Sequence, residues 1–185
     1  MDKRKKNYVG NRIYIIGPVG SGKTTLSRIL SQKYNIKEYE LDKIIWDDDN
    51  GNVKRTDEEI KKLFDKIIEK ESWIIEDVGR KKFIDGIKNA DITYYIDLPK
   101  LTIYRRCISR WIKQKIGKEE YNYKPTLKGL FEMLGWAKDG IKYKQEKIEQ
   151  IINNSKKYRI LKKKDIKELE KCDSNHNIIE FINQE

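Results

Sequence analysis

One nine-residue stretch, GPVGSGKTT at positions 17–25, constrains the fold of this chain more than any other part of it. It follows the apolar run RIYIIG, which is predicted to form a strand, and it precedes a segment with helical periodicity. Gly17, Gly22, Lys23 and Thr24 match the spacing G-x-x-x-x-G-K-[ST]. Glycines in such a loop let backbone N–H groups converge on anionic oxygens at the start of a helix. The stretch therefore predicts a phosphate-binding loop, or P-loop.

Each residue of this loop has an expected role in holding a nucleoside triphosphate. Lys23 is expected to reach the β- and γ-phosphates, and Thr24 to coordinate Mg²⁺. ATP and Mg²⁺ are the cofactors that follow from these roles. The nucleotide-binding residues are predicted to be Gly17, Pro18, Val19, Gly20, Ser21, Gly22, Lys23, Thr24 and Thr25.

Strand-like and helix-like runs alternate along the rest of the chain, which predicts an α/β protein with helices on both faces of a parallel sheet. The five predicted strands are RIYIIG, KEYELD, SWIIEDV, DITYYIDL and YRIL. Helices are predicted over residues 23–34, 56–70, 80–89, 100–116 and 126–153, with a short last one from Asp165. Thr56 followed by Glu59 forms a capping-box pattern. Residues 46–55 are polar, contain Asn-Gly and are expected to form a loop.

Length and composition favour a single domain in the cytoplasm. A chain of 185 residues holds one core of ordinary size. Cys107 and Cys172 are far apart and have no CxxC spacing, so neither a disulfide framework nor a zinc site is expected, and His176 has no evident catalytic partner. The basic opening MDKRKK leads into too short an apolar run for a signal peptide. No run is long enough to span a membrane.

The positive charge of the chain lies mostly in its second half. Residues 99–185 hold 21 Lys and Arg against 12 Asp and Glu, which contributes +9 of the net +11. Residues 99–118 alone hold seven basic residues and no acidic one. Such a run is either a solvated helix face or a surface that binds phosphates, nucleotides or nucleic acid.

Two arginines of the basic segment have the spacing of a phosphate-binding helix face. Arg106 and Arg110 are separated by one helical turn and so project from the same face, whereas Arg105 lies on another. The segment offers them no acidic neighbour, which weakens the alternative of ordinary surface salt bridges. Phosphoryl transfer depends on positioning and on positive charge around the migrating group. Arg106 and Arg110 are therefore predicted to be catalytic, together with Lys23.

Two classes of P-loop protein, GTPases and the large motor or helicase ATPases, do not fit this sequence. A GTPase would carry a base-reading [NT]KxD motif after a strand, and LDKI at residues 41–44 does not match it. Motor and helicase ATPases need a longer chain. A kinase that acts on a small acceptor fits both the length and the basic helix after the fourth strand.

The motifs beyond the loop resemble those of nucleoside-monophosphate-kinase-like P-loop proteins. The resemblance is greatest to the bacterial adenylate-kinase-related group labelled "DNA topology modulation", or FlaR-like, proteins. It covers most of the chain, through LDKIIW, SWIIEDVGR, DLPKLTIYRRCISR, LFEMLGWAKD and YRILKKKDIKELE. It implies a three-layer P-loop NTPase fold with a five-stranded parallel sheet and a small basic lid. The resemblance also places Asp42 and Trp46 beside the acceptor.

The segment SWIIEDVGR also resembles the Asp-Gly-Phe-Pro-Arg stretch of adenylate kinases. On that comparison Arg80 grips the acceptor phosphate, and Glu76 takes the place of the acidic residue near the metal. The change from Asp-Gly to Glu76-Asp77 leaves open which carboxylate approaches Mg²⁺, the contact in either case passing through water. Asp97, before Leu98 and Pro99, reads as a structural turn residue.

Three hypotheses apply to the role of Asp42, two of them functional and one structural. For a phosphate acceptor it would orient the substrate, and for a hydroxyl acceptor it could act as the general base. Alternatively it only caps the helix that follows its strand. The four tryptophans are expected to be packing residues rather than base-stacking ones, namely Trp46, Trp73, Trp111 and Trp136, and Trp46, beside Asp42, is the one to test for a contact with the acceptor.

These observations predict one domain over residues 1–185, with an acceptor-side insertion at about 43–71 and a lid at about 111–126. The predicted function is transfer of the ATP γ-phosphoryl group to a small acceptor, with a nucleoside monophosphate as the leading candidate. The alternatives are a kinase for the hydroxyl of a nucleoside, a sugar or a polynucleotide 5′ end, and a nucleic-acid-associated regulator that uses ATP binding as a switch. No helix-turn-helix, zinc finger or RNA-binding motif supports the regulator.

Overall fold

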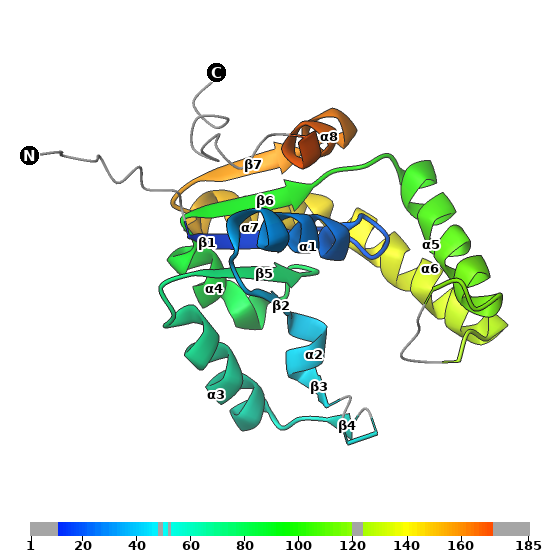
Figure 1. Ribbon diagram of the computed structural model, residues 1–185, viewed down its shortest axis with the longest axis horizontal. Coiled ribbons are helices and arrows are strands. Elements are labelled where there is room, and N and C mark those ends of the chain that lie inside the picture. Colours follow the sequence, from blue (N-terminus) through cyan, green and yellow to red (C-terminus); the bar gives the residue numbers. More distant parts are fainter. Residues whose placement is uncertain (1–10, 48–49, 52, 120–123, 172–185) are drawn as a thin grey trace, which may run out of the picture.

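The computed structural model describes residues 11–47, 50–51, 53–119 and 124–171. Five parallel strands form one sheet in the order β2-β5-β1-β6-β7 (Figure 1). The strands are β1 (Arg12–Ile16), β2 (Glu38–Glu40), β5 (Trp73–Asp77), β6 (Ile92–Ile96) and β7 (Tyr158–Leu161). The predicted α/β class, the sheet and its five strands are therefore confirmed.

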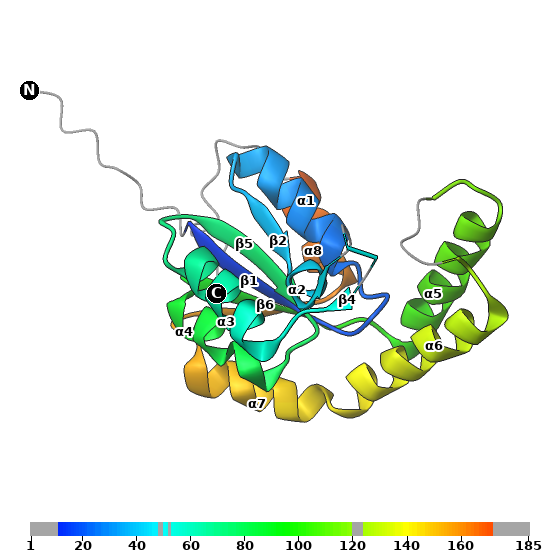
Figure 2. The same cartoon turned by 90° about the horizontal axis from the view of Figure 1, so that it is seen from below.

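Helices cover both faces of the sheet and make the fold three-layered (Figures 1 and 2). Helices α1 (Lys23–Tyr34) and α8 (Lys163–Lys171) pack on one face, with parts of α5 (Lys100–Lys115) and α6 (Leu127–Lys142). Helices α2 (Leu41–Ile45), α3 (Asp57–Ile68), α4 (Ile84–Asn89) and α7 (Lys144–Asn154) pack on the other. Because both faces are covered, all residues of β5 and β6 are buried, including the carboxylates Glu76 and Asp77 at the end of β5.

The capping box at the start of α3 forms as predicted. The Thr56 hydroxyl accepts from the Glu59 N–H at 3.2 Å, and the Glu59 carboxylate accepts from the Thr56 N–H at 2.9 Å. Three apolar residues of α3 face the core, Ile60, Phe64 and Ile67.

Two segments differ from the prediction. The polar stretch at 46–55 was expected to be a loop, but its described residues include a small antiparallel pair, β3 (Trp46–Asp47) with β4 (Val53–Lys54). The helix expected over 126–153 is two helices, α6 and α7, that meet at Tyr143. Two smaller differences follow. A 3₁₀ turn, η1 (Lys81–Phe83), precedes α4, and α8 begins at Lys163 rather than Asp165.

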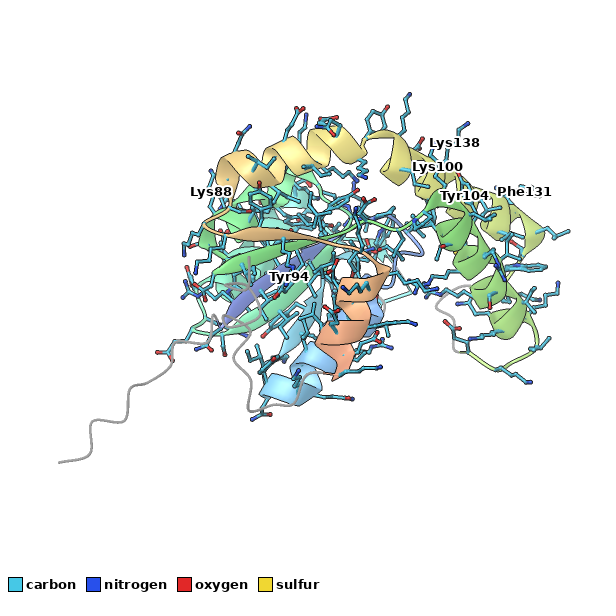
Figure 3. The ribbon with its side chains drawn as sticks, turned by 90° about the horizontal axis from the view of Figure 1, so that it is seen from above. Lys88, Tyr94, Lys100, Tyr104, Phe131 and Lys138 are labelled. Carbon is cyan, nitrogen blue, oxygen red and sulfur yellow. The ribbon has the colours of Figure 1, made fainter. Side chains whose placement is uncertain are left out.

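Helices α5 and α6 form an antiparallel arm that extends away from the sheet (Figure 2). The indole N–H of Trp111 on α5 donates to the Thr126 carbonyl at the start of α6, at 3.0 Å. Figure 3 labels Tyr104 and Phe131 on this arm and Tyr94 within the sheet. In the described part of the chain, none of the helices combines the length and the apolar character needed to cross a bilayer.

Candidate active site

The P-loop connects β1 to α1 at the carboxyl end of the central strand, the edge where ligands of open α/β sheets bind. Gly20 has φ 78° and Gly22 has φ 96°, a left-handed conformation that strains residues with a Cβ atom. The Ser21 N–H donates to the Pro18 carbonyl at 3.1 Å and closes the turn. Helix α1 then begins at Lys23, as the motif requires.

Helix α5 packs directly on this loop. A Cβ atom at Gly20 would lie 2.6 Å from the Cys107 sulfur and 3.1 Å from the Ile103 carbonyl, so space as well as φ requires glycine. The Arg106 guanidinium donates to the Ser21 carbonyl at 2.6 Å. Of the predicted arginines, Arg106 is therefore the one that the structure brings to the phosphate loop.

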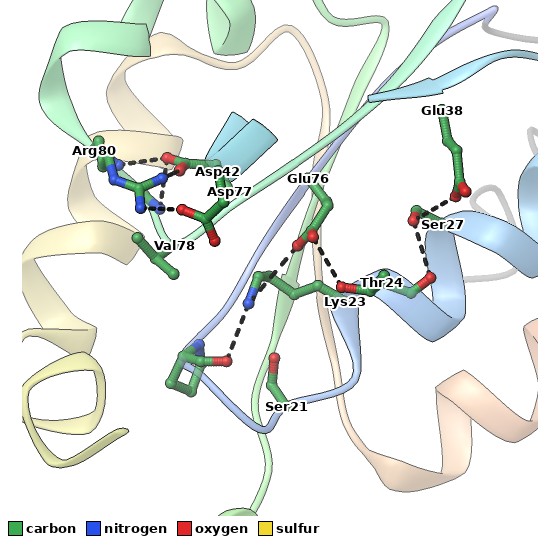
Figure 4. A network of polar contacts seen from close by, with 12 residues as sticks. Ser21, Lys23, Thr24, Ser27, Glu38, Asp42, Glu76, Asp77, Val78 and Arg80 are labelled. Atoms are coloured by element: carbon green, nitrogen blue, oxygen red, sulfur yellow. Dashed lines mark hydrogen bonds and ion pairs between the residues drawn. The ribbon is translucent and has the colours of Figure 1, made fainter. Parts of the chain in front are cut away.

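Lys23 and Glu76, both buried, and the partly buried Thr24 form a polar cluster next to the loop (Figure 4). The Lys23 ammonium donates to the Pro18 carbonyl at 3.2 Å and lies 3.8 Å from a Glu76 oxygen. The Thr24 hydroxyl donates to the other Glu76 oxygen at 2.8 Å. A hydroxyl and a carboxylate are the hard oxygen ligands that suit Mg²⁺, either directly or through water, so this pair fits the expected metal.

Burial raises the pKa of Glu76, and the Lys23 charge and the Thr24 hydrogen bond offset part of that rise. A carboxyl group that holds its proton more tightly in the folded state favours folding at low pH. This contribution is complete below the ordinary pKa of 4.5 and is lost as pH rises through the higher folded-state pKa.

We predict from this sign that Glu76→Gln, which is uncharged at every pH, becomes more stable relative to wild type as pH increases above 4.5. Thermal unfolding of both proteins between about pH 4 and 7, in buffer containing a metal chelator, measures the difference. A difference in melting temperature that stays constant or moves in favour of wild type across this range would contradict the prediction.

Asp77 is directed away from the P-loop cluster (Figure 4). Its carboxylate accepts from the N–H groups of Gly79 and Arg80, at 2.8 and 2.6 Å, and from the Arg80 guanidinium. The sequence left open which of the two adjacent carboxylates approaches the metal, and here Glu76 is the one in contact with Thr24 and Lys23.

Arg80 lies between two carboxylates, Asp77 and Asp42. Its guanidinium donates to Asp77 and to Asp42, and these charges keep the pKa of Arg80 raised although burial opposes the charged form. Asp42 is on α2, after the end of β2 at Glu40, and not at the end of a strand as its motif suggested. Its side chain is 62% exposed and accessible to a ligand.

Arg55 organises the backbone next to Asp42, a role that sequence reasoning missed. Its guanidinium donates to the carbonyls of Lys43, Ile44 and Trp46 and pairs with Asp47 at 3.0 Å. Trp46 itself is 37% exposed at the start of β3. No motif marks Arg55, because its partners are mainly backbone carbonyls.

Arg110 is one turn beyond Arg106 on α5 and pairs with Glu119 at 3.4 Å. The expectation that this helix has no acidic partner is therefore wrong for Arg110, since Glu119 immediately follows the basic segment. Arg105 is exposed. Cys107 is buried with a free thiol, whereas Cys172 and His176 lie outside the described residues.

Lys147 on α7 is a second residue that the sequence did not single out. Its ammonium donates to the Val78 carbonyl, and a Cβ atom at Gly79 would lie 3.1 Å from its Cδ. Burial lowers the pKa of Lys147. Lys144, one turn earlier, pairs with Asp97 at 2.7 Å, so that α7 holds the ends of β5 and β6 together.

Comparison with known proteins identifies the same loop-and-sheet unit. A family model described as an AAA domain (AAA_18) matches residues 13–124, more than half of the chain. A putative adenylate kinase from Methanocaldococcus jannaschii is 27% identical over 126 residues, a match that covers 64% of each protein. A shikimate kinase from Marinomonas sp. strain MWYL1 is 42% identical over 41 residues, 22% of each protein. The chain thus spans less than two thirds of the length of both relatives.

Solved structures show the same fold. A shikimate kinase from Bacteroides thetaiotaomicron superimposes with a TM-score of 0.56 and 15% identity, over 86% of this chain and 93% of that one. At this level of identity the likeness concerns the fold alone.

Proposed function

Because the chain belongs to the AAA_18 family of AAA domains, we propose that it is a kinase that transfers the γ-phosphoryl group of ATP·Mg²⁺ to a nucleoside monophosphate. The main support for a kinase is the contact of Thr24 and Lys23 with Glu76 beside the P-loop, because it places ligands suited to Mg²⁺ next to a cationic side chain. The relative named as a putative adenylate kinase supports the choice of acceptor.

The protein contributes binding and charge to this reaction. Mg²⁺, when bound, would neutralise charge on the β- and γ-phosphates, and Thr24 and Glu76 would hold it. Lys23 and Arg106 contribute positive charge at the loop where the triphosphate binds. An oxygen of the acceptor phosphate bonds to the γ-phosphorus while the bond from that phosphorus to the β,γ-bridging oxygen breaks. The products are ADP and a nucleoside diphosphate.

On the acceptor side, Arg80 supplies the guanidinium that would bind the monophosphate. A planar guanidinium can bind two phosphate oxygens at once, which an ammonium group does less well. In the free protein Arg80 is held by Asp77 and Asp42, so it is oriented before the substrate arrives. The acceptor phosphate would take the place of the exposed Asp42 carboxylate.

A kinase for a hydroxyl acceptor is the second candidate, because Asp42 offers a 62% exposed carboxylate on this side. An alcohol benefits from a general base, whereas a phosphate is already a nucleophile. The narrower assignment to the DNA topology modulation group, the use of ATP as a nucleic-acid switch and the cytoplasmic location stay predictions from the sequence.

Paired variants separate the two acceptor classes. With a nucleoside monophosphate, Arg80→Ala should raise KM for the acceptor at least tenfold. Arg80→Lys should restore only part of the lost acceptor binding, because an ammonium group cannot bind two phosphate oxygens in the planar, bidentate way of a guanidinium. Asp42→Asn should have a smaller effect and leave the pH profile unchanged. Initial rates across pH with a monophosphate, a nucleoside and a sugar measure this.

The opposite pattern would assign a hydroxyl acceptor. Asp42→Asn would then lower kcat by about 10² to 10⁴ and remove the acidic limb of the pH profile. Arg80→Ala would leave the rate with that acceptor nearly unchanged. This combination would contradict the monophosphate kinase.

A further inference from the structure

The α5–α6 arm presents one face of each of its helices to the P-loop. On α6 the contact is at Gly140, where a Cβ atom would lie 2.7 Å from the Pro18 Cβ and 3.1 Å from its Cα. On α5 the contact is Arg106, which donates to the Ser21 carbonyl. These two contacts fix which way each helix is turned relative to the phosphate loop.

Two aromatic residues flank Gly140 on the P-loop side, Trp136 within α6 and Tyr143 directly after its end. Trp136 and Tyr143 are four residues before and three residues after Gly140, and side chains with these spacings lie on one helix face. Trp136 is 61% exposed and Tyr143 is 46% exposed. Trp136 was expected to be a packing residue, as the fully buried Trp73 is, and its exposure departs from that expectation.

Basic residues share the corresponding face of α5. Arg110 and Lys113 follow Arg106 by four and seven residues, so all three side chains project from the same side of the helix. Arg110 and Lys113 are exposed. The P-loop side of the arm therefore combines cationic groups on one helix with exposed aromatic rings on the other.

We propose that this face binds a nucleotide, with the planar base of the acceptor stacked on Trp136. The proposal rests on the kinase function proposed above and makes its acceptor a molecule that carries a heteroaromatic ring. An indole offers a large stacking surface with little side-chain entropy to lose, and any base can stack on it. A sugar or an alicyclic acid has no π-face and would gain little from an exposed tryptophan at this position.

Phe131 provides a matched control on the same helix. It is 70% exposed, but it is nine residues from Gly140, which turns it about 180° away from the P-loop face. Figure 3 labels it on the arm. Phe131→Ala therefore removes a ring even more exposed than that of Trp136, but one that faces away from the proposed base site.

The test is calorimetric binding of AMP, CMP, GMP and UMP, with ribose 5-phosphate as a ligand that lacks a base. The P-loop is first saturated with a non-hydrolysable ATP analogue and Mg²⁺, so that only acceptor binding is measured. Trp136→Ala should weaken binding of the best nucleotide about tenfold or more, in line with base stacking on an aromatic residue. Trp136→Phe should restore much of it. Ribose 5-phosphate binding and the Phe131→Ala protein should be unchanged.

Each other outcome has a definite meaning. If Trp136→Ala binds the nucleotide as wild type does, or if Phe131→Ala is weakened equally, the stacking site is overturned while the kinase function stands. If Trp136→Ala weakens only the ATP analogue, the ring belongs to the donor and the acceptor assignment is overturned. If wild type binds none of the four nucleotides but phosphorylates an acceptor without a base, the proposed function fails and this inference fails with it.

Discussion

Lys23→Ala should reduce affinity for ATP·Mg²⁺ by a factor on the order of 100 and abolish measurable turnover, while the protein stays folded. The Lys23 ammonium is nearly buried, and within the described part of the chain the carboxylate close to it is Glu76. A charge-assisted contact to phosphate in such a water-poor site is stronger than one at the surface. The change deletes no side chain of the apolar core.

Lys23→Met is the matched control, because it keeps most of the aliphatic stem and removes the charge. Calorimetry with ATP·Mg²⁺ measures affinity, and thermal unfolding checks the fold. Both variants should lose binding to a similar extent, which assigns the loss to the charge. Wild-type affinity and turnover in either folded variant would contradict the phosphate-loop assignment.

Arg106→Ala should lower kcat by about 10³ and raise KM for ATP much less. Charge that acts on the migrating phosphoryl group counts mainly in the transition state, and arginines in this role contribute 10³ to 10⁵ in related reactions. Arg106 already contacts the P-loop, whereas Arg110 is one turn away and pairs with Glu119. Arg110→Ala should therefore have a smaller effect than Arg106→Ala.

Arg105→Ala is the control for helix stability and net charge, since Arg105 is on the same helix but on another face. Steady-state kinetics on the three variants gives the comparison. Equal and small effects from all three would mean that this helix is an ordinary solvated surface.

The loop, the sheet and the class of the fold could be predicted because their signals are local. Glycines with positive φ, a strand before them and a helix start after them are all encoded within residues 12–34. The Thr56 capping box is encoded in four adjacent positions in the same way. The burial of β6 and of the first three residues of β5 follows from runs of mostly apolar residues, but the burial of Glu76 and Asp77 does not.

The site residues that escaped prediction depend on contacts between distant segments. The Lys147 ammonium donates to the carbonyl of Val78, which is 69 positions away in the sequence. No local pattern distinguishes Lys147 from the surface lysines around it. No proline marks the break at Tyr143, and the nearest glycine, Gly140, lies inside α6. Helix α6 must reach Pro18 through Gly140, while Ile148 and Ile151 of α7 must cover the opposite face of the sheet. Tertiary packing therefore ends α6 where propensity alone does not.

Asp42 and Trp136 show the same limit in the prediction of roles. The sequence placed Asp42 at a strand end, but the carboxylate is on α2 with its charge paired to Arg80. Trp136 is a large apolar side chain of a type that often packs in the core, but it is 61% exposed on α6.

The central claim is that this chain transfers a phosphoryl group from ATP to a nucleoside monophosphate. The most direct measurement incubates the purified protein with Mg²⁺ and ATP labelled in its γ-phosphoryl group, and separates the products formed with each of the common nucleoside monophosphates, nucleosides, sugars and 5′-hydroxyl oligonucleotides. We expect label to appear in a nucleoside diphosphate, and to be absent when Lys23→Ala replaces the wild-type protein. Label found only in a phosphorylated alcohol or oligonucleotide, or ATP consumed with no labelled acceptor at all, would contradict the account.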